Sequence, residues 1–206
     1  MKKLVFLLFA LLPQFAAAQA FISNGLIFRC YSDEGGIVVG MEDGYQQPDS
    51  LVVPETVYDP YDEEYYNVTK IDENALQWGE YSIVTLPKTI VYLDEDAFST
   101  CNRLMHVYCF ATTPPRINSD GAFDSDLFER GTLHVPEEAI AAYKEASEWK
   151  EFKQIIALDA KSMGLAAVTG RQEADSRYFD LTGRRVTRSV LRSGLYIQNG
   201  KKIAIK

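Results

Sequence analysis

Alternating apolar and polar positions recur in short runs between residues 50 and 136. Four segments share this pattern, at 50–54, 83–87, 106–110 and 132–136. Three of the four end in proline, which has no N–H to donate to a neighbouring strand and therefore ends strand pairing. The pattern predicts four short strands whose side chains point alternately to two faces.

The connections between these strands also repeat. Segment 68–76 (Val-Thr-Lys-Ile-Asp-Glu-Asn-Ala-Leu) aligns with segment 90–98 (Ile-Val-Tyr-Leu-Asp-Glu-Asp-Ala-Phe), and a shorter copy, Ala-Phe at 122–123, precedes the last strand. One such unit cannot bury its apolar side alone, whereas stacked units bury a continuous core. The sequence therefore predicts a mainly β fold, built as a short solenoid of stacked repeats.

Aligning the four strands predicts which side chains share a face. The inward columns are expected to be Leu51, Val84, Val107 and Leu133, then Val53, Leu86, Cys109 and Val135. The opposite side, called the outer face below, is expected to present Val52, Ile83, Thr85, His106, Tyr108, Thr132 and His134. A patch that carries tyrosine and lacks formal charge has the composition of an interface core. The outer face is therefore the first candidate binding surface, unless a helix or loop covers it.

A second candidate surface combines tyrosines with carboxylates. Its members are Tyr58, Tyr61, Tyr65 and Tyr66, which surround the acidic run 59–64. Aromatic rings interleaved with acids on a hairpin tip can bind protein or glycan, or they can pack on the adjacent strands. The acidic runs here, at 94–96 and at 120–126 lack the spacing of an EF-hand loop. We therefore expect solvated turns and no metal site.

The sequence contains no arrangement typical of catalysis. Its two histidines, His106 and His134, are both expected on the outer face, whereas Cys109 is expected to point into the core. A nucleophile, a base and an orienting group are therefore not brought together. No nucleophile elbow, zinc-protease helix or phosphate-binding loop occurs. The sequence thus indicates neither an enzyme nor a cofactor site.

The N-terminus has the pattern of an export signal. Two lysines precede the apolar run 4–12, and small residues follow at 16–20. The run is shorter than the roughly 20 apolar residues of a membrane span. It therefore predicts a signal peptide over residues 1–20, cleaved after Ala18 or Ala20. No later run is long enough to span a bilayer, so we expect a protein that is secreted, displayed on the outer cell surface or periplasmic.

Charge and cysteine content narrow the range of partners. The chain has a formal net charge of −8 and a pI of about 4.9, and an acidic protein repels phosphate backbones, which argues against nucleic acid. The three cysteines are Cys30, Cys101 and Cys109. An odd number leaves at least one free thiol or an intermolecular bond, and small buried apolar residues are the simplest interpretation of all three.

Three segments follow the last repeat. Pro136 and the glutamates after it predict a helical cap over 137–152 that closes a repeat domain spanning 21–158. The glycine-interrupted segment 159–172 predicts a linker. Segment 173–206 then predicts a separate small β-sandwich or hairpin unit, because Asn-Gly at 199–200 stands between two apolar strands.

The repeats carry a resemblance to a known family. The spacings Ile71-x3-Ala75-Leu76, Val84-x-Leu86-Pro87 and Leu93-x3-Ala97-Phe98 resemble the BspA-like leucine-rich repeats of Bacteroidetes surface proteins. The opening strands at 21–40 and the closing segment 135–152 are similar to other parts of that family, so the resemblance covers about residues 21–158. Leu76 stands where the family prefers Phe, and Asp72 and Asp94 stand where it often has Gly. The resemblance implies a non-enzymatic, adhesin-like scaffold that binds proteins.

The C-terminal segment carries a second resemblance. Asp-Leu-Thr-Gly-Arg-Arg-Val at 180–186 and Gly-Leu-Tyr-Ile at 194–197 resemble the sorting domains read by type IX secretion in Bacteroidetes, with a purely structural appendage as the alternative. Asp49-Ser50-Leu51 is similar to an O-glycosylation site of the same phylum, which makes Ser50 a candidate. Two functions therefore stay open: an adhesin-like protein-binding module, or a carbohydrate-associated accessory protein that uses the tyrosine hairpin.

Overall fold

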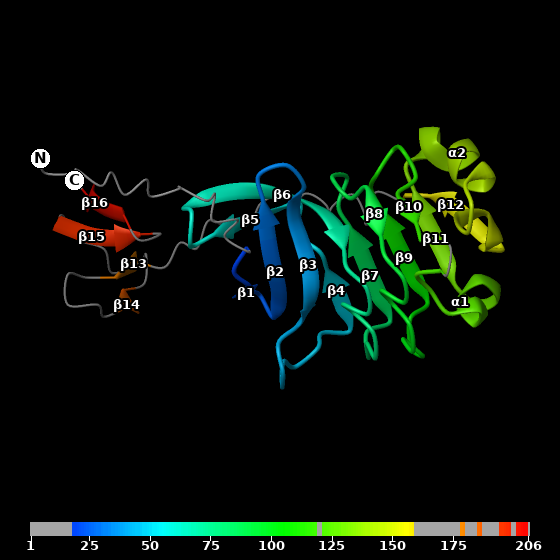
Figure 1. The fold of residues 1–206 in the computed structure, drawn as a ribbon, viewed down its shortest axis with the longest axis horizontal. Helices are drawn as coiled ribbons and strands as arrows, with labels where there is room; N and C mark the ends of the chain where they lie inside the picture. Colours follow the sequence, from blue (N-terminus) through cyan, green and yellow to red (C-terminus); the bar gives the residue numbers. More distant parts are fainter. Residues whose placement is uncertain are drawn as a thin grey trace, which may run out of the picture.

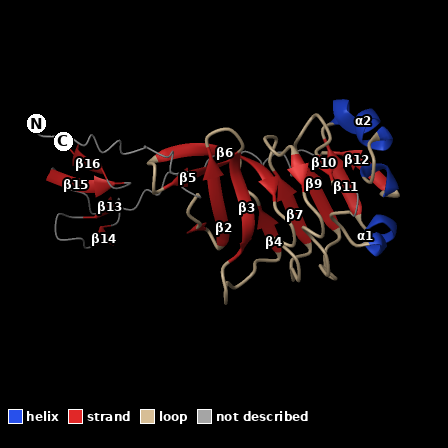
Figure 2. Ribbon diagram, in the orientation of Figure 1, coloured by secondary structure: helices blue, strands red, loops and turns tan. Residues whose placement is uncertain are grey.

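Most of the regular secondary structure in the described chain is β-strand, and its helices are few and short (Figure 1, Figure 2). The computed structural model describes residues 18–118 and 121–158, together with the backbone of four strands between 178 and 205. The mainly β class expected from the sequence is confirmed. The expected signal peptide over 1–20 lies outside the described residues except for 18–20, and the expected linker 159–172 lies wholly outside them.

One sheet contains the four strands that the alternating pattern predicts. In spatial order it runs β12 (Gln154–Ala157), β11 (Thr132–Val135), β9 (His106–Cys109), β7 (Ile83–Leu86) and β4 (Ser50–Val52). All neighbours in this sheet pair in parallel. Parallel neighbours require the chain to travel back between one strand and the next, and a second sheet contains much of that return path.

The second sheet has seven strands. Its spatial order is β1 (Phe21–Ser23), β2 (Leu26–Tyr31), β3 (Gly35–Met41), β6 (Glu64–Ile71), β8 (Tyr92–Leu93) and β10 (Arg116–Ile117), and β5 (Thr56–Asp59) also pairs with β6. Strands β1, β2 and β3 pair antiparallel, whereas β3, β6, β8 and β10 pair in parallel. The N-terminal strands therefore begin the stack, and the repeats extend it.

Backbone hydrogen bonds join successive turns between the two sheets. The N–H of Leu76 donates to the carbonyl of Ala97 at 2.9 Å, and the N–H of Phe98 donates to the carbonyl of Ala122 at 2.9 Å. The rings of Phe98 and Phe123 stack with centroids 5.1 Å apart. Equivalent positions of consecutive repeats therefore lie directly beside each other, as the aligned segments predict.

The core lies on the inward side of the five-stranded sheet. Both inward columns expected from the sequence are buried: Leu51, Val53, Val84, Leu86, Val107, Cys109, Leu133 and Val135. They join one continuous apolar cluster with residues of the seven-stranded sheet, among them Ile71 and Leu93. Each fully buried aliphatic side chain contributes about 1.5–3 kcal/mol relative to exposure to water. The stacked arrangement thus buries what no single repeat could bury.

A helix that the sequence analysis did not anticipate precedes the last repeat strand. Helix α1 (Ser125–Arg130) begins within the last two residues of the stretch 120–126 that was expected to be an acidic turn, and of its residues only Leu127 is buried. Arg130 donates to the carbonyl of Leu104 at 2.8 Å and to Asp126 at 2.9 Å. A single buried position in six residues gives no helical periodicity, which explains why the pattern did not reveal this helix.

The C-terminal cap consists of three short helical segments. They are η1 (Glu137–Ala139), α2 (Ile140–Glu145) and η2 (Trp149–Glu151). Helix α2 ends because Ala146 is extended and Glu148 has a φ of 66°. Tyr143, Trp149 and Phe152 are nevertheless buried, as expected of a cap that folds back on the core.

The C-terminal strands form a sheet of their own. It runs β14 (Arg185–Val186), β13 (Tyr178–Phe179), β15 (Gly194–Gln198) and β16 (Lys201–Ile205), with all neighbours antiparallel. Gln198 pairs with Lys201, so two residues join β15 to β16, in agreement with the predicted hairpin. The second layer of a sandwich stays a prediction.

Candidate functional site

The outer face is the more coherent of the two candidate surfaces. The strand register aligns Ser50, Ile83, His106, Thr132 and Gln154 in one row, and Val52, Thr85, Tyr108, His134 and Ile156 in the next. These rows contain the seven residues grouped from the sequence, in the expected order. Neither row contains Asp, Glu, Lys or Arg. A charge-free surface therefore crosses five parallel strands of an acidic protein.

Two members of this face are buried and the other five are partly exposed, which corrects the expectation that all seven face solvent. Thr85 is 1% exposed and His134 is 7% exposed. Thr85 lies between Val52 and Tyr108 in the register, so its shorter side chain sits below theirs. The His134 ring is covered because it stacks on the Tyr108 ring, with centroids 4.0 Å apart and planes 16° from parallel.

Three rings form a connected group at the centre of the face. Nδ1 of His106 lies 3.2 Å from Nε2 of His134, within hydrogen-bonding distance. The His106 ring also approaches the Tyr108 ring, with centroids 6.4 Å apart. A hydrogen bond between two imidazoles requires one nitrogen to donate and the other to accept, so at least one ring must be neutral. The three rings therefore hold one another in place.

One strand of the face was not predicted from the sequence. Strand β12 pairs in parallel with β11 and places Gln154 beside Thr132 and Ile156 beside His134. Ile156 is 45% exposed, which makes it one of the larger exposed apolar side chains of the described residues. The only signal was a pair of β-branched residues, Ile155 and Ile156, after the cap. With β12 the face gains an apolar end.

Two hydroxyl groups of the face are buried without a hydrogen-bond partner among the described residues. They are Oγ of Ser50 and Oγ1 of Thr85. A buried hydroxyl without a partner costs roughly 1–3 kcal/mol. The Ser50 hydroxyl is therefore inaccessible in this conformation of β4, and its O-glycosylation stays a prediction.

The cap leaves the outer face uncovered because it packs on the opposite side of the sheet. The Tyr143 hydroxyl donates to the carbonyl of Ala111 at 2.9 Å and to Sγ of Cys109 at 3.1 Å, and Cys109 belongs to an inward column. The Trp149 indole N–H donates to the carbonyl of Pro115 at 2.8 Å. In Figure 2 the helices gather at the end of the stack that holds β11 and β12. Helix α2 therefore does not lie over the outer face.

The tyrosine hairpin is formed by β5 and β6. Tyr58 and Tyr65 are directly paired across the two strands, with ring centroids 5.0 Å apart, and both are exposed. Tyr61 at the tip is 59% exposed and packs edge-on against Phe21. Tyr66 differs from the other three, because it is half-buried against the core and its hydroxyl donates to Asp62. Three of the four candidate tyrosines are therefore available to a ligand.

Buried polar groups lie beneath the hairpin. Asp59 is 4% exposed, and its carboxylate accepts the backbone N–H of Tyr61 at 2.8 Å. Burial, together with the negative charges of Asp59 and Asp62, raises the pKa of the Cys30 thiol to about 12. Such a thiol stays protonated at neutral pH and is a poor nucleophile. This arrangement positions the hairpin turn and offers no reactive group.

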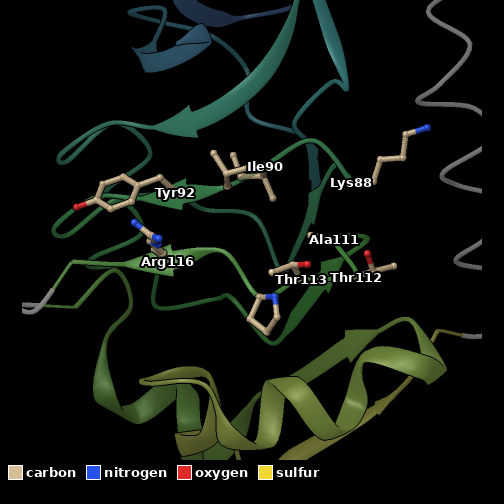
Figure 3. Close-up of a pocket in the computed structure, with 9 residues that line it drawn as sticks. Lys88, Ile90, Tyr92, Ala111, Thr112, Thr113 and Arg116 are labelled. Atoms are coloured by element: carbon tan, nitrogen blue, oxygen red, sulfur yellow. The ribbon is translucent and has the colours of Figure 1, made fainter. Parts of the chain in front are cut away.

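A shallow depression of about 510 Å³ lies between the loops that lead into β8 and β10 (Figure 3). Its lining combines apolar, hydroxyl and cationic residues, among them Ile90, Tyr92, Thr113, Lys88 and Arg116. Lys88 forms an ion pair with Glu55 at 3.0 Å, and its side chain points away from Tyr92 and Arg116 in Figure 3. The groups that line this depression do not converge on one point, so it is the weakest of the three candidates.

Several kinds of site do not occur in the described part of the chain. Within residues 18–118 and 121–158 no three His, Cys, Asp or Glu side chains cluster in a way that would hold a metal ion. The described residues contain no helix long and apolar enough to cross a membrane. Cys109, the cysteine nearest in sequence to His106, is fully buried and hydrogen-bonded to Tyr143, so it does not act together with the histidines.

Comparisons with known proteins found structural similarity alone. No protein-family profile and no curated protein sequence matches the chain. A crystal structure of a leucine-rich repeat protein from Bacteroides capillosus is 18% identical, with a TM-score of 0.42, and covers 56% of this chain and 97% of that one. A leucine-rich cell surface protein from Faecalibacterium prausnitzii is 15% identical, with a TM-score of 0.39. That match covers 70% of this chain and 34% of the other.

Proposed function

We propose that this chain is an exported, non-enzymatic scaffold of the BspA-like leucine-rich-repeat type that binds a protein partner through its outer face. The observation that carries the proposal is the composition of that face. Two aligned rows of residues cross five strands without a formal charge, although the whole chain has a net charge of −8. Depletion of charge around an exposed aromatic group distinguishes the centre of protein interfaces from ordinary surface.

The arrangement of side chains supports binding rather than catalysis. Tyr108 is held rigid by the stacked His134 ring, so it would lose little conformational freedom when a partner covers it. Ile83 and Val52 are half-buried on the same face, and they extend the apolar surface on one side of the aromatic group, across β7 and β4. A rigid aromatic anchor beside apolar contacts is typical of an interface hot spot.

A charge placed in the centre of the face tests this proposal. In Ile83→Glu the new carboxylate would be desolvated by a partner, so we expect at least a hundredfold loss of affinity for proteins that the wild-type mature chain captures from surface extracts. Val91→Glu is the matched control, because Val91 is 59% exposed and lies outside the outer face. Equal loss in both variants, or in neither, would contradict binding through the outer face.

Glycan binding by the tyrosine hairpin is the second candidate function. It is favoured by the exposure of Tyr58, Tyr61 and Tyr65 beside the exposed carboxylates at 62–64, since aromatic faces and carboxylates are suited to sugar rings and hydroxyls. A glycan array probed with the mature chain separates the two functions. Sugar binding that disappears in Tyr65→Ala and persists in Ile83→Glu would support the hairpin and replace the first proposal.

Two targeting signals, one at each end of the chain, are also part of the proposal. Residues 1–20 would direct export and be removed, and residues 173–206 would act as a type IX sorting domain that delivers the protein to the outer surface or medium. The expected N-terminus of secreted material is Gln19 or Phe21. N-terminal sequencing that finds Met1 on extracellular protein would contradict the export signal.

A further inference from the structure

We propose that His106 and His134 together form a binding site for a divalent transition-metal ion such as Zn²⁺, Ni²⁺ or Cu²⁺. The site lies on the outer face, and it does not depend on the protein-binding role proposed above. No metal site was expected from the acidic runs of the sequence, and two histidines 28 positions apart form no recognisable ligand motif. Only the strand register brings them together.

The distance between the two nitrogens matches what one metal ion requires. Zn–N bonds of about 2.0–2.1 Å and ligand angles between square-planar and tetrahedral place two nitrogen ligands roughly 2.9–3.4 Å apart. Nδ1 of His106 and Nε2 of His134 are 3.2 Å apart. Both nitrogens can therefore coordinate one ion after small rotations of the rings, which exchange a hydrogen bond for two metal bonds.

The surrounding strands hold the two ligands in position. His106 lies beside Thr132, and His134 lies beside Tyr108, so the two histidines are diagonal neighbours on adjacent parallel strands. The Tyr108 ring stacks on the His134 ring at 4.0 Å and fixes its plane. Preorganised ligands lose little conformational entropy when the ion binds, which favours binding by even two protein ligands.

Access and electrostatics also favour a cation here. His134 is buried, but His106 is only partly buried, so solvent reaches the site from the His106 side, and water can occupy the remaining coordination positions. Neither row of the outer face contains Lys or Arg, so no fixed positive charge within the face opposes the ion. The net charge of −8 raises the local concentration of cations around the whole molecule.

The sequence makes an unusually clean test possible. The chain contains two histidines in total, so an untagged mature protein has no other imidazole to bind Ni²⁺. We expect calorimetric titration with Ni²⁺ to show one ion per chain, and the thermal midpoint to rise with metal concentration, because an ion that binds only the folded state stabilises it by mass action.

The variant His106→Gln separates coordination from structure. Its amide can keep a hydrogen bond to His134 while the imidazole ligand is lost, so folding is preserved and the affinity for Ni²⁺ should fall at least tenfold. Thr132→Ala, next to His106 in the register, is the matched control and should bind as the wild type does. Equal Ni²⁺ affinity in wild type and His106→Gln would overturn the proposal, as would the absence of binding to wild type at millimolar Ni²⁺.

A spectroscopic measurement identifies the ligands directly. Sub-stoichiometric Cu²⁺ broadens the proton resonances of coordinated imidazoles, and the wild-type chain has two such rings to observe. Broadening of both histidine signals is the expected result. If Cu²⁺ binds and neither histidine signal broadens, the ion is bound by carboxylates or thiols, and the proposal is wrong.

Discussion

The indole N–H of Trp149 donates a 2.8 Å hydrogen bond to the carbonyl oxygen of Pro115, a residue 34 positions earlier in the chain. Both residues are buried, and the Trp149 ring also meets Tyr143, Phe123 and Phe152. This contact connects the cap to the loop that leads into the last strand of the seven-stranded sheet. The Trp149–Pro115 contact therefore closes the C-terminal end of the repeat stack.

Loss of this contact should destabilise the whole repeat region. In Trp149→Phe the carbonyl of Pro115 loses its partner and a cavity remains, so we expect the free energy of unfolding to fall by about 2–4 kcal/mol. Urea denaturation measures the change. Trp78→Phe is the matched control: Trp78 is the only other tryptophan and is 66% exposed, so its replacement should change stability by less than about 0.5 kcal/mol. Similar losses in both variants would contradict the assigned role of Trp149.

A second prediction concerns acid stability. Asp94 accepts hydrogen bonds from Asn118 at 2.8 Å and pairs with Lys70 at 2.9 Å. Partial burial tends to raise the pKa of Asp94, but the hydrogen bonds from Asn118, Lys70 and the Glu95 N–H outweigh it and hold the pKa below its ordinary value of 3.8. A carboxyl whose pKa is lowered by folding stabilises the protein above its unfolded pKa, and this contribution is lost as the pH falls through the folded pKa.

The variant Asp94→Asn should therefore be less stable than wild type at pH 7, and the difference should shrink below about pH 4. Thermal midpoints recorded from pH 7 to pH 2 measure it. Asp33→Asn, which removes one carboxylate from an exposed turn, is the charge-matched control. If the thermal midpoints of wild type and Asp94→Asn differ by the same amount at every pH, the charge of Asp94 does not contribute to stability.

A third prediction concerns the thiols. Cys30, Cys101 and Cys109 are all buried and none is bonded to another. Burial raises the pKa of Cys109 to about 11 and also raises that of Cys101. Ellman's reagent should therefore titrate no thiol in the native protein at pH 8 and three in guanidinium chloride. Rapid native reaction of even one thiol would show that the fold opens near it.

The C-terminal sheet provides a fourth prediction. Strands β13 to β16 pair only with one another among the described strands. A chain that ends at Leu158 should therefore unfold at the same urea midpoint as the mature protein, within about 0.2 M, while its delivery to the cell surface is lost. A lower midpoint for the truncated chain would show that the tail stabilises the repeats.

Structure could be predicted from the sequence where local rules determine it. Alternation within short strands and the spacing of Ala75 and Ala97 predicted the inward columns and the parallel register, because a one-residue shift would expose every core side chain. It failed at β8 and β10, which are two residues long and are defined by pairing with distant strands. The sequence also could not predict that His134 is buried, because the ring that covers it, Tyr108, belongs to another strand.

The absence of any disulfide has a consequence for where the molecule can fold. Because its three cysteines are each enclosed separately in the core, the native state contains no bond whose formation requires an oxidant. The free energy of folding is thus independent of the thiol redox potential of the surroundings. The same molecule should be obtained from a reducing cytosol and from an oxidising exterior, so a fold completed on either side of a membrane needs no oxidoreductase to assist it.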